Sequence, residues 1–318
     1  VTSSIGPGAT NMVTAAALAH VNRLPVLFLP GDVFANRAPD PVLQQIENFS
    51  DGTASVNDCF KPVSRYFDRI MRPEQLLTAL PRALRVMTDP AECGPVTISL
   101  CQDVQAEAFD FPTSFFKTKK WVMRRLSPDV NEVDFASSLI KESQLSVIIS
   151  GGGTHYSKAT LRLQKFAELH GIPVVETQAG KSSLPWNHPL NFGPVGVTGS
   201  EAANSICEEA DVILGVGTRF QDFTTGSWSL FKNPNRQLIS LNIAAYDAAK
   251  HGAVPLLADA HVGLSLLSEK LGEFKAKTPP QVLKDDWFRK VDELTQSPVT
   301  KNSLATDMQV IGAVQRSA

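Results

Sequence analysis

Cysteine is scarce in this chain of 318 residues, and its arrangement excludes two common uses of that residue. The four cysteines (Cys59, Cys93, Cys101 and Cys207) form no CxxC pair and show no metal-binding spacing. A disulfide framework and a zinc site are therefore both disfavoured. We expect reduced, buried thiols and a cytoplasmic protein.

An excess of one charge and a long hydrophobic run are also missing. The chain has 30 Lys and Arg against 32 Asp and Glu, a formal net charge of −2, so we expect no nucleic-acid partner. No apolar run approaches the roughly 20 residues that cross a bilayer, and the first residues lack the pattern of a secretion signal. We therefore expect no membrane partner. The hydrolase motifs GxSxG and HExxH are absent too.

The sequence does contain an alternation of strand-like apolar runs and helix-like segments, which is typical of parallel α/β layers. In the first block we predict strands at 1–5, 25–29 and 95–100, and helices at 9–22 and 76–87. In the second block we predict strands at 146–150, 172–177, 211–217, 237–243 and 253–259. The helices predicted there are 158–170, 200–210, 261–271 and, further on, 283–294.

These patterns predict an α/β protein with two folded blocks. We place a first domain at 1–105 and an inter-domain linker at 106–132, where the periodicity fails. A Rossmann-like, doubly wound central domain with a parallel sheet follows at 133–274. The polar stretch 275–318 is predicted to be a connector.

The motif GPGATN follows the first predicted strand and opens a helix. Gly6 and Gly8 leave backbone N–H groups bare and give room for a flat or anionic ligand. Pro7 fixes one φ angle, and Asn11 projects an amide from the first helical turn. The pattern fits a ligand-binding bend and equally a tight α/β crossover, so both interpretations stay open.

A second glycine run, Gly151–Gly153, follows the strand at 146–150. It suggests a dinucleotide site, but Tyr156 stands where GxGxxG requires its last glycine. The acidic residue expected further along is matched approximately by Glu176. We favour tight packing over nucleotide binding for this run.

Two long loops, 176–200 and 217–226, lie at the carboxyl ends of predicted strands, where ligands collect in open α/β sheets. Their polar candidates are Lys181, His188, Asn191, Arg219 and Asp222. Lone residues of these types in such loops are more often structural, and we favour that interpretation.

Gly31 and Asp32, with Asn57 further on, superficially match a Mg²⁺-diphosphate motif, because hard cations bind carboxylate and amide oxygens. Val33 and Asp58 stand where the motif needs a glycine and a second asparagine. We interpret the match as accidental.

Taken together, GPGATN and the following RLPVLFLPGDV resemble the pyrimidine-binding domain of thiamine diphosphate enzymes of the acetolactate synthase type. The stretch ETQAGKSSLPWNHPLNFGPVGVTG, with ADVILGVGTRFQDFTTG, resembles their central domain. Longer strings resemble, within that superfamily, the trihydroxycyclohexane-dione hydrolases of inositol catabolism. They are APDPVLQQIENF, KPVSRYFDRIMRPEQLL, GPVTISLCQDVQAEAFDF and VVETQAGKS.

The resemblance implies that Gly6, Pro7, Gly8 and Asn11 bind the cofactor, thiamine diphosphate, which acts with Mg²⁺. The superfamily's catalytic glutamate precedes the GPG turn, whereas the first acidic residue here is Asp32. The superfamily's Mg²⁺ ligands lie in a third domain, and no part of this sequence resembles that domain. We therefore expect no catalytic residue and no metal ligand in this chain, and we expect an inactive fragment of a longer enzyme.

For that longer enzyme the resemblance implies hydrolysis of a C–C bond in a small cyclic 1,2-diketone, trihydroxycyclohexane-1,2-dione, to 5-deoxy-glucuronate. It also implies a homodimer or homotetramer. Three alternatives stay open: a carboligase like acetolactate synthase or glyoxylate carboligase, a module that binds FAD or ADP, and a non-catalytic remnant. We do not expect a flavin in this branch.

Overall fold

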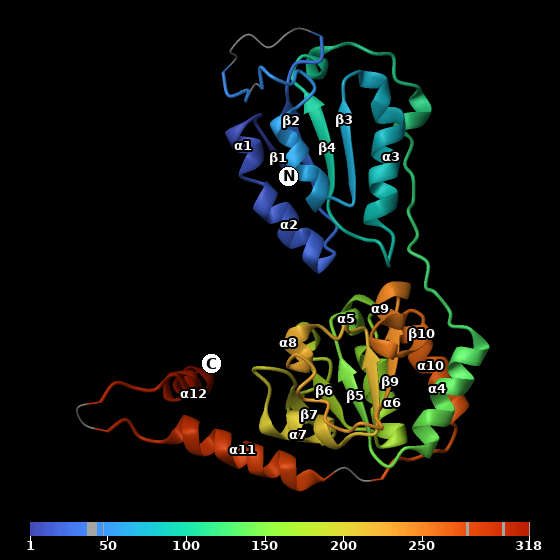
Figure 1. Cartoon of the computed structure of the whole chain (residues 1–318), viewed down its shortest axis with the longest axis vertical. Helices are drawn as coiled ribbons and strands as arrows, with labels where there is room; N and C mark the ends of the chain where they lie inside the picture. Colours follow the sequence, from blue (N-terminus) through green and yellow to red (C-terminus); the bar gives the residue numbers. More distant parts are fainter. Residues whose placement is uncertain (37–42, 47, 278–279, 301–302, 318) are drawn as a thin grey trace. The chain divides into compact units, whose positions relative to one another are not determined.

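The computed structural model describes residues 1–36, 43–46, 48–277, 280–300 and 303–317 (Figure 1). The chain divides into two compact units, Val1–Arg124 and Arg125–Ala318. Each unit contains one sheet, in which every strand pair is parallel. The predicted α/β class is confirmed, whereas the predicted domain boundaries stay predictions.

The first unit has four strands in the order β1-β2-β4-β3. They are β1 (Thr2–Ser3), β2 (Leu27–Asp32), β3 (Tyr66–Ile70) and β4 (Val96–Cys101). Its helices are α1 (Pro7–Thr10), α2 (Val13–Asn22) and α3 (Leu76–Met87), with 3₁₀ helices η1 (Val56–Val63), η2 (Pro73–Gln75), η3 (Val104–Ala106) and η4 (Thr113–Phe116).

Successive side chains of β2 point to opposite faces of this sheet, and each face has its own core. Phe28 packs with Ala9, Ala16 and Phe60, which come from α1, α2 and η1. On the other face, Leu27 joins the cluster beneath α3. The sheet is therefore covered by helices on both faces.

The second unit has six strands in the order β10-β9-β8-β5-β6-β7. They are β5 (Ser146–Ser150), β6 (Val174–Glu176), β7 (Asn191–Pro194), β8 (Val212–Val216), β9 (Gln237–Asn242) and β10 (Val254–Leu257). Counted from β5 along the chain, this is the order 3-2-1-4-5-6 of the doubly wound dinucleotide-binding fold. The predicted Rossmann-like central domain is confirmed.

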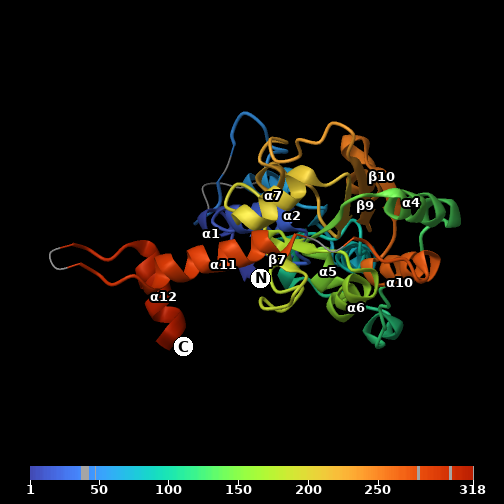
Figure 2. The same ribbon diagram turned by 90° about the horizontal axis from the view of Figure 1, so that it is seen from below.

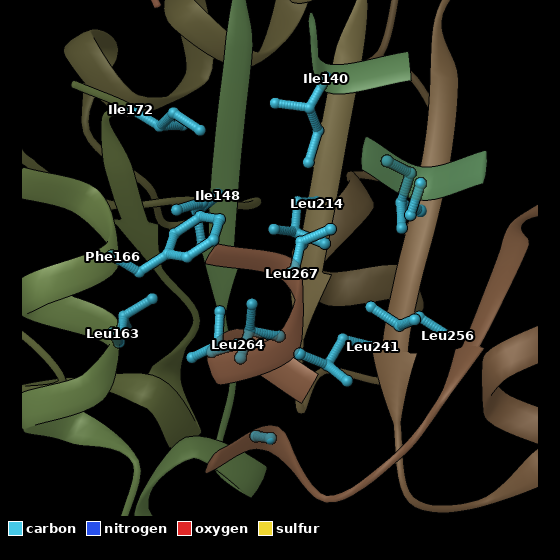
Figure 3. Close-up of a cluster of buried hydrophobic side chains, with 14 of the residues drawn as sticks. Ile140, Ile148, Leu163, Phe166, Ile172, Leu214, Leu241, Leu256, Leu264 and Leu267 are labelled. Atoms are coloured by element: carbon cyan, nitrogen blue, oxygen red, sulfur yellow. The ribbon is translucent and has the colours of Figure 1, made fainter. Parts of the chain in front are cut away.

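One face of this second sheet is covered by three helices, α4 (Val130–Glu142), α6 (Thr160–His170) and α10 (Ala260–Leu271). Figure 3 shows Phe166, Leu264 and Leu267 gathered over Ile148 and Leu214 of the sheet. These side chains are fully or almost fully buried. Strands that are buried on both faces give nearly continuous apolar runs, which is why the sequence identified them.

The opposite face is covered mainly by α7 (Glu201–Glu209). Helix α11 (Gln281–Gln296) packs on α7 (Figure 2). Its Leu283 and Trp287 join the cluster on this face. Nζ of Lys284 also donates a hydrogen bond to the carbonyl of His188. The first helix of the predicted connector is thus part of the packed unit.

The remaining helices are α5 (Gly153–Tyr156), α8 (Asp222–Thr225), α9 (Ala245–Ala249) and α12 (Asp307–Ser317), with 3₁₀ helices η5 (Gln178–Gly180) and η6 (Lys250–Gly252).

The structure differs from the predicted elements at several positions. The helix predicted at 9–22 is interrupted at Asn11 and Met12, because the N–H of Met12 bonds to the carbonyl of Ala9 in a tighter turn. The 3₁₀ helices were not predicted, and neither were strands β3 and β7 or helices α4, α5, α8, α9 and α12. Within the described residues, each helix is too short or too polar to cross a bilayer.

Candidate functional site

The GPG turn lies where β1 ends, at the carboxyl edge of the first sheet. Gly6 is buried and has φ +67°, a left-handed conformation that glycine adopts without steric cost. It caps α1, and its carbonyl accepts a hydrogen bond from the N–H of Thr10 at 2.9 Å. Pro7 is at the first helical position, where its fixed φ and missing N–H are tolerated best. The predicted strand–turn–helix is therefore present.

Both glycines of this turn allow close approach of other parts of the chain. A Cβ added to Gly6 would lie 1.7 Å from the carbonyl oxygen of Gln44, and one added to Gly8 would lie 2.5 Å from Oγ of Ser4. The segment 43–46 therefore lies directly against the turn. Pro7 and Asn11 are exposed. The glycines serve the chain's own packing, the other two residues are accessible to a ligand, and all four cofactor contacts stay predictions.

Beside this turn, the end of β2 carries a buried ionic network. The fully buried carboxylate of Asp32 accepts hydrogen bonds from Nε of Arg69 at 2.7 Å, from Oγ of Ser99 at 2.7 Å and from Oγ of Ser55. Arg69 also donates to Asp58 at 2.6 Å. Burial opposes the charge of Arg69, but the hydrogen bonds and charges of the two aspartates outweigh it and raise its pKa.

Asn57 lies in the same network and binds two groups of the chain itself. Its Nδ2 donates to the carbonyl of Gly31 at 2.7 Å and to Oγ of Ser99 at 2.8 Å, so the amide joins β2 to β4. Asp32 is already engaged by a guanidinium and two hydroxyls. In the part of the chain that the structure describes, no group of three His, Cys, Asp or Glu residues is placed to hold a metal ion. These contacts support the interpretation that the Asp32–Asn57 pattern is accidental.

Asp103, which sequence reasoning did not single out, holds the loop that follows β2. Its carboxylate accepts hydrogen bonds from the N–H groups of Ala35 at 2.9 Å, Asn36 at 2.8 Å and Val104 at 3.0 Å. Burial opposes ionisation, but these hydrogen bonds prevail and lower the pKa of Asp103. A single aspartate after a strand gives no local signal for such a role, because its partners lie far away in sequence.

In the second unit, the ligand crevice of a doubly wound sheet would lie between β5 and β8, where the strand order reverses. Here the turns after these strands touch. The N–H of Gly153 donates to the carbonyl of Gly217 at 3.0 Å. A Cβ at Gly151 would lie 2.4 Å from that same carbonyl oxygen. The contact supports the tight-packing interpretation of the glycine run.

The polar candidates of the two loops mostly hold those loops together. Asn191 is buried, and its Nδ2 donates to the carbonyl of Pro185 at 3.2 Å. Nε2 of His188 lies 3.0 Å from Oε1 of Glu168, and Asp222 accepts a hydrogen bond from Oγ of Ser227 at 2.7 Å. The interpretation of these residues as structural is supported by these contacts.

The remaining candidates of this region, Glu176, Lys181 and Arg219, differ in their contacts within the structure. Oε1 of Glu176 accepts from Oγ of Ser183 at 3.1 Å and from the N–H of Leu184 at 3.0 Å, so it fixes the loop after β6. Lys181 lines a shallow pocket beside Glu176. Arg219 is also engaged within the chain.

Comparison with known proteins finds a family model that matches part of the second unit and relatives that match most of the chain. Residues 133–267 match the family model of the thiamine pyrophosphate enzyme central domain. The chain is 49% identical over 295 residues to a 3D-(3,5/4)-trihydroxycyclohexane-1,2-dione hydrolase of Geobacillus thermodenitrificans, covering 92% of the chain and 46% of the relative. It is 46% identical over 311 residues to that of Clostridium tetani, covering 96% and 48%.

A protein of Bacillus cereus with the same name, numbered 1, is 51% identical over 270 residues, covering 85% of the chain and 42% of the relative. The expected resemblance is thus confirmed by the family-model match over residues 133–267 and by these relatives. The chain spans about half the length of the curated relatives it matches.

Proposed function

We propose that this chain forms the cofactor-facing turn and the central domain of a thiamine diphosphate-dependent hydrolase. The proposed reaction cleaves a C–C bond of trihydroxycyclohexane-1,2-dione with water to give 5-deoxy-glucuronate. The observation that carries the proposal is 46–49% identity over 92–96% of the chain to proteins named as hydrolases of that dione. Such similarity extends through both units and is not confined to the central domain.

The residues of the turn fit one part of the proposed cofactor site. Thiamine diphosphate, when bound, supplies a centre that stabilises a carbanion, and the protein supplies orientation and electrostatics. Pro7 and Asn11 are exposed at the carboxyl edge of the first sheet and are proposed to contact its aminopyrimidine ring. Gly6 and Gly8 fix the shape of the turn that presents them.

The carboxylates described beside the turn are already engaged, because Asp32 and Asp58 both bind Arg69. We propose that the activating glutamate and the Mg²⁺ ligands lie outside the given residues. A cytoplasmic homodimer or homotetramer is proposed for the complete enzyme.

The experiment is a ring-opening assay of the full-length protein that contains this chain. The purified protein is incubated with the dione, thiamine diphosphate and Mg²⁺, and products are followed by mass spectrometry. We expect a cofactor-dependent product heavier than the dione by one water, and no turnover by the given chain alone. Carboligation of pyruvate or glyoxylate without ring opening would refute the proposed function.

A further inference from the structure

An open pocket of about 690 Å³ lies in the first unit, beside the second half of α3. It is lined by four cationic side chains, and we call it the basic pocket. They are Arg82 and Arg85 of α3, and Lys119 and Lys120 of the segment after η4. All of its lining residues precede Arg125, so the pocket belongs to one unit. Its volume lies within the range of roughly 300–1,000 Å³ that is usual for small-molecule sites.

The basic pocket and the GPG turn lie at opposite edges of the first sheet. Tyr66, which also lines the pocket, is the first residue of β3. The turn, in contrast, follows the end of β1. Because all strand pairs of this sheet are parallel, the start of β3 lies at the amino edge and the end of β1 at the carboxyl edge. The pocket is therefore separate from the turn.

The charge of the basic pocket is not balanced by the chain. Across the part of the chain that the structure describes, none of the four cations forms an ion pair, and no carboxylate lines the pocket. Asp68 reaches the pocket wall indirectly, by accepting a hydrogen bond from the hydroxyl of Tyr66 at 2.8 Å. Arg82 also interacts with this hydroxyl. The pocket keeps an excess of positive charge when Asp68 is counted, although the whole chain has a net charge of −2.

Helix electrostatics explains only part of this arrangement. Arg85 lies in the last turn of α3, where a cation interacts favourably with the helix dipole. Arg82 stands three residues before it, and like charges at that spacing on a helix repel each other. Lys119 and Lys120 belong to no helix or strand, so the dipole gives no reason for their position. Gathering four like charges costs free energy, and a bound anion offsets that cost.

The basic pocket also offers apolar surface. Half-buried Trp121 lines it together with Pro81 and Val86 of α3. Nζ of Lys119 lies 4.5 Å from the centroid of the Trp121 ring, so a cation and an aromatic surface are held together. Apolar walls with a few converging polar groups are typical of small-molecule sites, whereas a nucleic acid is bound by an extended basic surface. The arrangement therefore favours a compact anion with an organic part.

We propose that the basic pocket binds a small organic phosphate that carries several negative charges, the chemistry of nucleoside di- and triphosphates. The two guanidinium groups and the two ammonium groups bind the phosphate oxygens, since charge-assisted hydrogen bonds of this kind are the strong ones. The ring of Trp121 contacts the organic part of the ligand. This site goes beyond the proposed function and does not depend on it.

The test measures anion binding to the full-length protein that contains this chain, by isothermal titration calorimetry in buffer without Mg²⁺. The probes are ATP and inorganic tripolyphosphate. The variant Arg85→Gln/Lys120→Gln removes two charges from the basic pocket. Its control, Lys165→Gln/Lys275→Gln, removes the same charge from exposed lysines of the second unit. We expect the dissociation constant of ATP to rise about 10- to 100-fold in the pocket variant and less than about 2-fold in the control.

The two probes separate the sources of the phosphate. Tighter binding of ATP than of tripolyphosphate supports an organic ligand, and equal binding overturns that assignment. Equal dissociation constants of ATP in the pocket variant and in the control would place the anion elsewhere. Binding of single-stranded RNA without binding of ATP would assign the pocket to a nucleic acid. Either result overturns the inference, and so does the absence of ATP binding at about 1 mM.

The melting temperature without ligand tests whether the cations serve the fold instead. Removing repulsion should leave the melting temperature of the pocket variant unchanged or raise it by about 2–4 °C. A fall of more than about 2 °C, with the control unchanged, would mean that the charges are structural and would overturn the inference.

Trp121 gives a local readout, because it is the one tryptophan that precedes Arg124 in the sequence. ATP should change the tryptophan fluorescence of the wild type, and Trp121→Phe, which keeps an aromatic ring, should remove most of that change. A change of equal size in Trp121→Phe would contradict binding at this pocket. None of these measurements uses turnover of the dione, so the inference and the proposed function fail independently.

Discussion

At the scale of single residues, the buried ion pair between Asp32 and Arg69 is important for the stability of the first unit. The carboxylate of Asp32 is fully buried, and the side chain of Arg69 is 18% exposed. Removing one partner of such a pair leaves the other charge buried and uncompensated, which costs more than the pair itself contributes. The network also joins β2, β3 and η1, since Arg69 binds both Asp32 and Asp58.

We therefore predict that Arg69→Met lowers the free energy of unfolding of the first unit by about 3–5 kcal/mol. Urea denaturation followed by circular dichroism measures the change. The control is Arg72→Met, because Arg72 is 76% exposed and pairs with Glu74 at 3.5 Å. An exposed pair contributes little, so the control should change the unfolding free energy by less than about 0.5 kcal/mol. Equal effects of the two substitutions would contradict the prediction.

The residues of the turn show what the sequence can and cannot predict at this scale. Gly6 was expected at a position that needs glycine, and its φ of +67° bears out that local requirement. The carbonyl oxygen of Gln44 also requires glycine at position 6, because it leaves no room for a side chain there. Gln44 lies 38 residues further along the chain, so no local pattern indicates this contact. Asp103 was missed for the same reason, since its partners Ala35 and Asn36 belong to another strand's loop.

At the scale of elements, apolar runs identified the central strands, and the strands that were missed lack such runs. In β3, aromatic and charged residues stand together (YFDRI), and its Arg69 is held by Asp32 rather than by apolar packing. β7 contains a glycine and a proline (NFGP), which usually indicate a loop. Tertiary pairing produced both strands despite weak local preference.

The end of α6 shows how one side chain joins two elements. His170 is fully buried, with Nδ1 2.8 Å from the carbonyl of Phe274 and Nε2 2.9 Å from Oγ of Ser268 on α10. Burial lowers the pKa of His170, and the hydrogen bond to Phe274 opposes this only in part. The folded protein therefore prefers the neutral ring.

This preference predicts a pH dependence of stability. Below the ordinary histidine pKa of about 6.5, the unfolded chain takes up a proton that the folded chain resists. The contribution of His170 is thus complete above about pH 6.5 and is lost as pH falls from there through the lower folded pKa. Urea midpoints measured between pH 5.5 and 8 should fall on acidification in this window. His170→Asn, which keeps a donor for Phe274, should flatten the curve, and an unchanged slope in that variant would refute the prediction.

At the scale of the whole molecule, the buried apolar clusters divide between the two units. Within the described residues, the two clusters of the first unit draw all their members from residues before Arg124. The two clusters of the second unit draw all of theirs from residues after Arg125. A unit that contains a complete core of its own meets the main requirement for independent folding.

We predict that residues 125–318 fold without residues 1–124. Their six-stranded sheet has helices on both faces, and α11 completes one of those faces through Leu283 and Trp287. A protein of residues 125–318 should therefore show a cooperative thermal transition, whereas one of residues 125–276, which lacks α11, should melt at a lower temperature. Differential scanning calorimetry with near-ultraviolet circular dichroism measures both. A non-cooperative transition for residues 125–318 would show that the second unit depends on the first. Identical melting temperatures for the two proteins would show that α11 contributes no packing energy to the central domain.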